Sequence, residues 1–232
     1  MLRKKVILFL VEGPSDDTAL SVLLEQIFDQ NEVRVFIEYG DVTTERGANG
    51  SNILKRVSGL VEGFAKNNHL GKKHFDRIVH ILDMDGAFIK TADIEEDPSA
   101  ESTMYTPEKI HTRNVQGIEA RNKQNRECIQ RLTGVRLVWG VPYQAYYMSC
   151  NLDHVLYDRL NLTDEEKENL SFAFAKRYER NIGGFVEFIC QSPFSVVSEY
   201  RESWQFIQQG RHSLQRHTNL GICLQQAFTP QK

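Results

Sequence analysis

The 232-residue chain has few cysteines, no long apolar segment and no large excess of either charge. Its cysteines are Cys128, Cys150, Cys190 and Cys223. They are widely spaced, with no C-x-x-C pair and no histidine at zinc-ligand spacing, so we expect reduced thiols and a cytoplasmic protein. No apolar stretch approaches the roughly 20 residues that a membrane-spanning helix needs, so we expect no membrane association. The formal net charge of -3 predicts no general attraction to nucleic acid, although basic residues confined to one face would provide one.

Other sequence signals are also missing. The chain contains no G-x-x-x-x-G-K-[ST] phosphate-binding loop, no internal repeat and no low-complexity tract. If ATP regulates this protein, a partner ATPase therefore has to bind it. The basic N-terminus and short apolar run superficially resemble a signal peptide, but the run meets Glu12 after six residues and has no small-residue cleavage site. We interpret this segment as the first strand of the fold.

Two apolar runs end directly in acidic residues. Residues 6–11 are followed by Glu12, and the apolar run that ends at Leu82 is followed by Asp83 and Asp85. Uninterrupted apolar strands are typical of the centre of a parallel sheet, where ligands bind beyond the carboxyl ends of the strands. Carboxylates that meet there repel one another unless a hard divalent cation with oxygen ligands neutralises them. The sequence therefore predicts a Mg²⁺ or Mn²⁺ site.

Alternating strand and helix patterns lie on either side of these acids. Ser15 is expected to cap a helix whose first turn carries Asp16 and Asp17, where negative charge suits the helix dipole. The further expected elements are an edge strand over 33–39, a helix over 53–64 and a strand over 77–82. This order predicts an α/β fold with a parallel sheet of about four strands flanked by helices.

The second half of the chain is more irregular. Residues 86–115 form a long acidic loop or insertion, which we interpret as a solvated excursion, as a lid over the substrate or as the source of a further metal ligand. A helix over 115–132 and a fourth strand over 135–139 are expected to follow. An acidic residue, Asp153, again comes soon after that strand. We expect one α/β domain over 1–150 and a helical C-terminal extension over 151–232.

These residues resemble the TOPRIM domain of topoisomerases, primases and OLD-type nucleases. That family has a Glu after its first strand and an Asp-x-Asp after its third, which Glu12 and Asp83-Met84-Asp85 match over about residues 5–155. The Glu12-Gly13-Pro14-Ser15-Asp16 form and the later Asp153 are most similar to stand-alone and OLD-type TOPRIM nucleases. A topoisomerase would also need a companion domain with a nucleophilic tyrosine, and a primase would need a zinc module; neither is recognisable here.

The resemblance implies specific roles for these residues. Asp83 and Asp85 would bind Mg²⁺ or Mn²⁺, and Glu12 would complete the metal shell or act as general acid/base. Asp16, Asp17 and Asp153 are candidates for a second metal, although the first two would also simply favour the start of a helix. Such a metal pair, about 4 Å apart, can activate water for hydrolysis of a phosphodiester. The implied protein is a metal-dependent nuclease that cuts DNA or RNA, and family analogy alone suggests antiviral defence.

The C-terminal extension combines aromatic residues with arginine and histidine. Arg211 and Arg216 are candidate phosphate contacts for a nucleic acid. The neighbouring apolar side chains instead suit a helix face packed on the core: Trp204, Phe206, Ile207, Leu214 and Leu220. His80 and His154 are expected to be structural.

Three alternatives stay open. One is a ribosomal-RNA maturase, a TOPRIM branch that Val11-Glu12-Gly13 followed by Asp16-Asp17-Thr18 also resembles. Another is a non-catalytic effector, or a subunit activated by an ATPase partner. The third, a receiver-like phosphoacceptor domain, would explain acids at strand ends, but the Glu12-Gly13 element argues against it. Assembly into a homo-oligomer is left open by the sequence.

Overall fold

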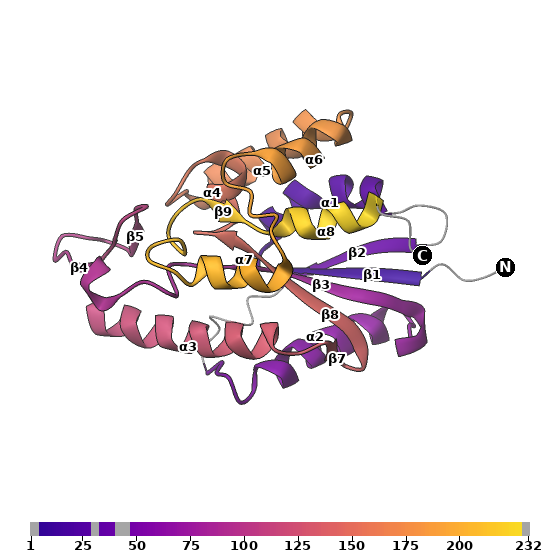
Figure 1. The fold of residues 1–232 in the computed structure, drawn as a ribbon, viewed down its shortest axis with the longest axis horizontal. Helices are drawn as coiled ribbons and strands as arrows, with labels where there is room; N and C mark the ends of the chain where they lie inside the picture. Colours follow the sequence, from indigo (N-terminus) through magenta and orange to yellow (C-terminus); the bar gives the residue numbers. More distant parts are fainter. Residues whose placement is uncertain (1–4, 29–32, 40–46, 229–232) are drawn as a thin grey trace.

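A six-stranded, mostly parallel sheet forms the centre of the protein, as seen in a computed structural model that describes residues 5–28, 33–39 and 47–228 (Figure 1). Its parallel part has the order β2 (Val33–Tyr39), β1 (Lys5–Val11), β3 (Phe75–Asp83) and β8 (Val141–Ser149). Two short antiparallel strands, β7 (Leu137–Val138) and β9 (His217–Thr218), pair with β8. The predicted α/β class and the edge position of the second strand are confirmed.

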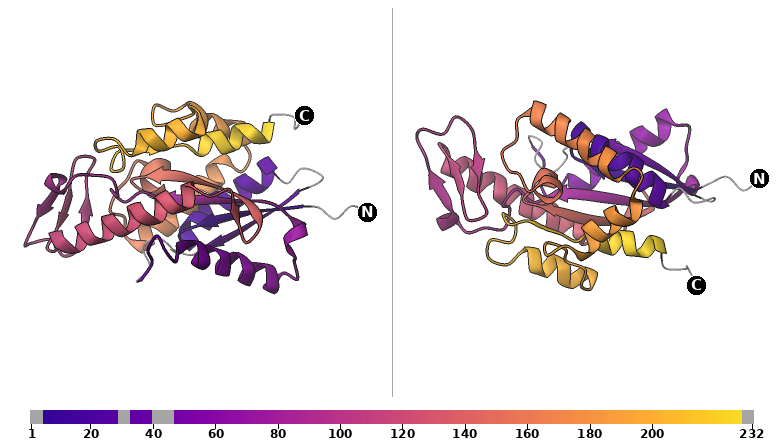
Figure 2. Two further views of the ribbon diagram at one scale, coloured as in Figure 1. Left: turned by 60° about the horizontal axis from the view of Figure 1, so that its bottom comes forward. Right: turned by 90° about the horizontal axis from the view of Figure 1, so that it is seen from above.

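Helices cover both faces of this sheet, which explains why its central strands are apolar throughout. In β1, Ile7 and Phe9 face one core and Leu8 and Leu10 face the other, all at most 2% exposed. Helices on the first face are α1 (Pro14–Phe28), α4 (Leu152–Tyr157), α5 (Asp164–Tyr178), α6 (Ile182–Gln191) and α8 (Leu220–Phe228). Helices on the second face are α2 (Ile53–Asn67) and α3 (Val115–Thr133) (Figure 2), and α7 (Tyr200–Ile207) adds Trp204 and Ile207 to the same core beside β8. Polar and apolar residues do not alternate along a strand whose two faces are both buried.

The fourth parallel strand lies elsewhere than predicted. It is β8, not residues 135–139, of which only Leu137–Val138 form a strand, in a hairpin with β8. Trp139 and Gly140 make the two-residue turn with φ of 53° and 78°, the left-handed conformation that tight hairpins require. The polar Gln144 and the turn-forming residue Pro142 concealed β8 in the sequence.

Residues 86–115 contain structure that the sequence did not reveal. A 3₁₀ turn (Thr91–Asp93) leads into a three-stranded sheet of β4 (Ile94–Glu96), β6 (Ile110–Thr112) and β5 (Met104–Tyr105), which lies beyond the carboxyl ends of the large sheet (Figure 1). Its strands of two or three residues are too short to give a periodic signal. A small apolar cluster that includes Ile94, Ile110 and Leu214 holds this insertion against the rest of the protein.

Within residues 151–228, α4 to α8 pack on the main sheet, and strand β9 in the same segment pairs with β8. The apolar side chains proposed as a packed face are indeed buried: Trp204, Ile207, Leu214 and Leu220 are at most 5% exposed, and Phe206 is half-buried. A second 3₁₀ turn, Lys72–His74, precedes β3. Among the described residues, no helix is long and apolar enough to cross a membrane.

Candidate functional site

Two strand ends that are far apart in sequence meet at the carboxyl edge of the sheet. Glu12 directly follows β1, and Asp83 is the last residue of the neighbouring strand β3. The backbone N–H of Asp83 donates a hydrogen bond to Glu12 Oε1 at 3.0 Å. The expectation that these two acids lie together is therefore met by a direct bond between them.

Asp83 is also tied to the start of α4. Its Oδ1 accepts a hydrogen bond from the backbone N–H of Leu152 at 2.9 Å. Leu152 is the first residue of that helix, where backbone N–H groups have no partner within the helix. This contact brings the next residue, Asp153, to the same edge of the sheet.

Asp16 lies at the start of α1. The helix begins at Pro14, so Ser15 is its second residue and not the cap that the sequence suggested. Asp16 Oδ2 instead accepts the backbone N–H of Gly13 at 2.9 Å, which holds the carboxylate at the helix start. The neighbouring Asp17 is only partly buried.

Asp153 forms an ion pair that the sequence did not predict. Its Oδ2 lies 3.2 Å from Nζ of Lys167 in α5, and Asp153 is 6% exposed. Asp153 Oδ1 and the hydroxyl of Tyr157 are buried and have no hydrogen-bond partner. Because Asp153 and Tyr157 are four residues apart on one short helix, they occupy the same face of α4.

Asp85 lies in a tight turn whose backbone carbonyls accept hydrogen bonds from arginine side chains of α3. Asp85 and Gly86 have φ of 45° and 69°, and a Cβ at Gly86 would lie 2.7 Å from Leu214 Cδ2, so only glycine fits. Arg121 Nη2 donates to the Asp85 carbonyl at 2.8 Å and Arg126 Nη1 to the Ala87 carbonyl at 2.7 Å. Arg121 also donates to the hydroxyl of Tyr105 in the insertion. Two arginines thus fix the turn that carries the second acid of the Asp-x-Asp pair.

The carboxylates of this edge destabilise one another's charged forms. Burial raises the pKa of Asp83 well above its usual value, and the nearby Glu12, Asp16, Asp85 and Asp153 raise it further. Burial also raises the pKa of Asp16 to about 6, against the opposing effect of the Gly13 hydrogen bond, and Asp153 adds to the rise. Five of the six acids singled out from the sequence, all except Asp17, therefore interact electrostatically as one cluster, which we call the carboxylate cluster: Glu12, Asp16, Asp83, Asp85 and Asp153.

The chemistry of this donor set suits a hard divalent cation. All five side chains offer carboxylate oxygens, which Mg²⁺ and Mn²⁺ prefer, and burial together with the neighbouring acids raises the pKa values of Asp16 and Asp83. Within residues 5–28, 33–39 and 47–228, however, no three acidic, histidine or cysteine side chains are arranged as a formed metal-binding group. The carboxylate oxygens of the cluster would have to move closer to one another to coordinate the ion.

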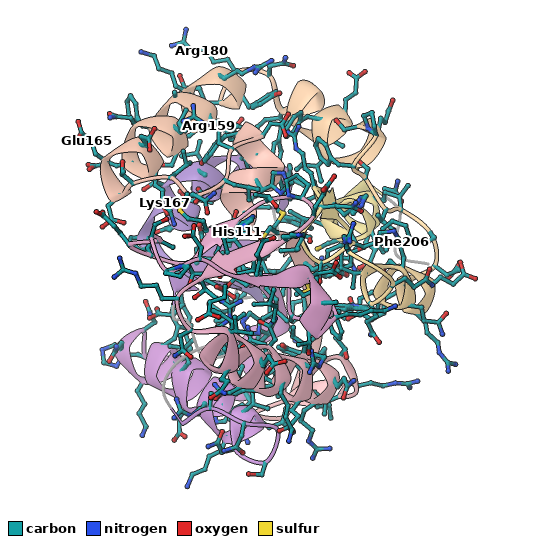
Figure 3. The ribbon with its side chains drawn as sticks, turned by 90° about the vertical axis from the view of Figure 1, so that its left-hand side faces the viewer. His111, Arg159, Glu165, Lys167, Arg180 and Phe206 are labelled. Atoms are coloured by element: carbon teal, nitrogen blue, oxygen red, sulfur yellow. The ribbon has the colours of Figure 1, made fainter. Side chains whose placement is uncertain are left out.

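A cleft of about 450 Å³ opens beside the cluster. Its walls come from the start of α1 and from α5: Gly13, Pro14, Ser15, Thr18, Asp164, Lys167, Glu168 and Ser171. Lys167 belongs both to this cleft and to the ion pair with Asp153, so it links the cleft to the carboxylate cluster. Figure 3 shows Lys167, Arg159 and His111 on the face toward which the parallel strands run.

The other residues singled out from the sequence lie in defined contacts. Arg211 pairs with Asp93, with Nη2 2.6 Å from Oδ1. Arg216 donates from Nη2 to the Val155 carbonyl at 2.7 Å and lies 3.2 Å from Asp158. Arg211 thus connects the C-terminal extension to the insertion, whereas Arg216 joins two segments of the extension itself.

The two histidines have structural contacts, as expected. His80 is buried and its Nδ1 lies 2.8 Å from the Tyr143 hydroxyl, while burial lowers its pKa to about 3. His154 Nδ1 accepts the backbone N–H of Cys150 at 3.1 Å. All four cysteines are buried and free.

Sequence reasoning missed Lys167, Arg121 and Tyr157. Lys167 lies among acidic residues on a helix that reads as solvent-exposed, and Arg121 is one of several basic residues on α3, so neither carried a local signal. Tyr157 is four residues after Asp153, a spacing that could have indicated a shared helix face.

Comparison of the chain with family models, curated proteins and solved structures gave no match.

Proposed function

We propose that the protein is a metal-dependent nuclease that hydrolyses phosphodiester bonds of DNA or RNA at the carboxylate cluster. The observation that carries this proposal is the hydrogen bond from Asp83 N–H to Glu12 Oε1 at 3.0 Å, which joins acids 71 positions apart at the carboxyl edge of a parallel sheet. Acids in that place, in the order Glu then Asp-x-Asp, are what the TOPRIM resemblance leads one to expect. The proposed function does not involve association with a membrane.

In this function Asp83, Asp85 and Glu12 hold a Mg²⁺ or Mn²⁺ ion. When bound, such an ion lowers the pKa of an attacking water and stabilises negative charge on the phosphate. Leu152 and Gly13 orient Asp83 and Asp16 through their backbone N–H groups. Asp16, with a pKa of about 6, is suited to accept a proton near neutral pH. The Lys167 ammonium at the cleft contributes positive charge where a phosphate would approach.

The direct test is cleavage of plasmid DNA and of total RNA in Mg²⁺ and in Mn²⁺. Wild-type protein is expected to cut at least one substrate, and Asp83→Asn and Glu12→Gln are expected to lose this activity while retaining the fold. The amide variants keep the shape and the hydrogen-bond acceptor of each side chain. Cleavage that survives in both variants would contradict the proposed site.

A second candidate function is a partner-activated effector subunit. It is favoured by the acidic first turn of α5, where Asp164 lines the cleft and Glu165 and Glu166 follow, because these side chains repel a phosphate backbone (Figure 3). A partner protein that covers this turn would remove the repulsion. Folded wild-type protein that cuts neither substrate alone, but cuts after addition of an ATPase partner, would favour this candidate.

A further inference from the structure

The carboxylate cluster has two halves that differ in their local charge. Glu12, Asp83 and Asp85 lie at the ends of β1 and β3, and the strongest charge effect on the Asp83 pKa comes from Glu12. Asp16 and Asp153 lie at the starts of α1 and α4, and the charges that act on the Asp16 pKa are those of Asp153 and Lys167. A fixed positive charge is therefore already present in the helix half.

Lys167 is held in that half as a cation. Its Nζ lies 3.2 Å from Asp153 Oδ2, and Asp153 is buried enough that its charge needs a partner. Partial burial lowers the pKa of Lys167, but Asp153, Asp83 and Asp16 together raise it above its usual value. The ammonium thus contacts Asp153 directly and is also stabilised by the charges of Asp83 and Asp16.

The same place has oxygen atoms that could bind a cation if the ammonium were absent. Asp153 Oδ1 and the Tyr157 hydroxyl are buried without a partner, and the charges of Asp153 and Asp16 both act on Tyr157. A divalent ion and the ammonium would repel each other strongly if they shared this small, poorly solvated space. Only one of the two can neutralise the helix half.

We propose that Lys167 takes the place of a second divalent cation, so that the protein binds a single Mg²⁺ or Mn²⁺ ion, held by Glu12, Asp83 and Asp85. This inference rests on the metal-dependent function proposed above and changes one expectation from the sequence. Asp16 and Asp153 then pair with the ammonium and are not ligands of a second metal.

The test is the number of Mn²⁺ ions bound per chain. Metal-free protein is titrated with MnCl₂, and free Mn²⁺ is measured by electron paramagnetic resonance. Wild type is expected to bind one ion. Lys167→Met removes the charge but keeps most of the side-chain stem, and it is expected to bind two. Lys167→Arg, which keeps the charge, and Lys176→Met, an exposed control on the same helix, are expected to bind one.

The outcomes separate this inference from the proposed function. Two ions bound by wild type would overturn the role of Lys167 and leave the metal-dependent nuclease intact. A single ion bound by folded Lys167→Met would overturn it as well. No Mn²⁺ bound by folded wild type would overturn both the metal site and the inference that depends on it.

Discussion

Two groups of polar side chains in the main sheet differ sharply in how well they are satisfied. In the middle of the sheet, His80 is 1% exposed, but its Nδ1 contacts the Tyr143 hydroxyl at 2.8 Å and burial keeps the ring neutral. At the carboxyl edge, burial and mutual repulsion raise the pKa of Asp83, and Asp153 Oδ1 has no partner. His80 and Tyr143 are hydrogen-bond partners of each other, whereas the carboxylates at the edge require an additional positive charge. This difference separates a structural pair from a candidate site.

The comparison predicts opposite consequences of mutation in the two groups. Asp83→Asn should lower the rate of metal-dependent cleavage by a factor on the order of 10³, because the ion loses a charged ligand. The folded state should be no less stable without metal, because the amide oxygen can still accept from Leu152 and one repelling charge is gone. Cleavage rates and thermal unfolding of the same preparation check both effects. If Asp83→Asn is destabilised but fully active, Asp83 belongs to the structural group and not to the candidate site.

A smaller effect is expected from Asp16→Asn, measured as stability against pH without metal. The folded-state pKa of about 6 lies above the ordinary value of 3.8, so protonated Asp16 favours folding at low pH. This contribution is lost as pH rises from about 4 through 6. Ionised Asp16 then costs the wild type up to ~3 kcal/mol at neutral pH.

Asp16→Asn should therefore be more stable than wild type at pH 7.5, and the difference should shrink as pH falls from about 6 to about 4. Urea unfolding at several pH values measures it. Glu25→Gln, an exposed change on the same helix, is the matched control and should show little difference at any pH. A constant difference between Asp16→Asn and wild type across the pH range would contradict the raised pKa.

In the satisfied pair, Tyr143→Phe should lower the free energy of unfolding by about 2 kcal/mol, because buried His80 loses the partner of its Nδ1. Cleavage should stay at the wild-type rate, since the pair lies away from the carboxyl edge of the sheet. Denaturant unfolding together with the cleavage assay checks this prediction. Loss of activity without loss of stability would mean that the pair takes part in function.

The smallest effect concerns the turn that presents Asp85. Arg121→Met removes the donor to the Asp85 carbonyl and should weaken Mn²⁺ binding about tenfold, the low end for residues that support a metal ligand. Lys123→Met, an exposed change on the same helix, should leave affinity unchanged. Equal affinity in the two variants would show that the turn holds its position without Arg121.

The acids could be predicted from the sequence because each follows an apolar strand, and strand ends in a parallel sheet share one edge. Glu12 and Asp83 are joined as this rule requires. The fourth strand was misplaced because Pro142 and Gln144 interrupt its pattern and only pairing with β3 reveals it. The small sheet within the predicted insertion was missed because its strands have two or three residues and depend on tertiary packing around Ile110.

Lys167 could not have been predicted from the sequence, since its role depends on the way α5 packs against α1 and α4. Its neighbours along the chain, Glu166 and Glu168, predict only a charged solvent face. The partner that gives Lys167 its role is Asp153, on a different helix. Contacts of this kind depend on tertiary structure and leave no periodic trace.

The most direct test of the account is whether Mn²⁺ stabilises the protein through the carboxylate cluster. Thermal unfolding of wild type and of Asp83→Asn at pH 7.5 would be compared without metal and with Mn²⁺ at about 100 times its dissociation constant. The wild-type midpoint should rise by several degrees, as expected for about 2.7 kcal/mol of binding energy, and the variant should shift little. An equal rise in both proteins, or none in wild type, would contradict a cation site at this edge of the sheet.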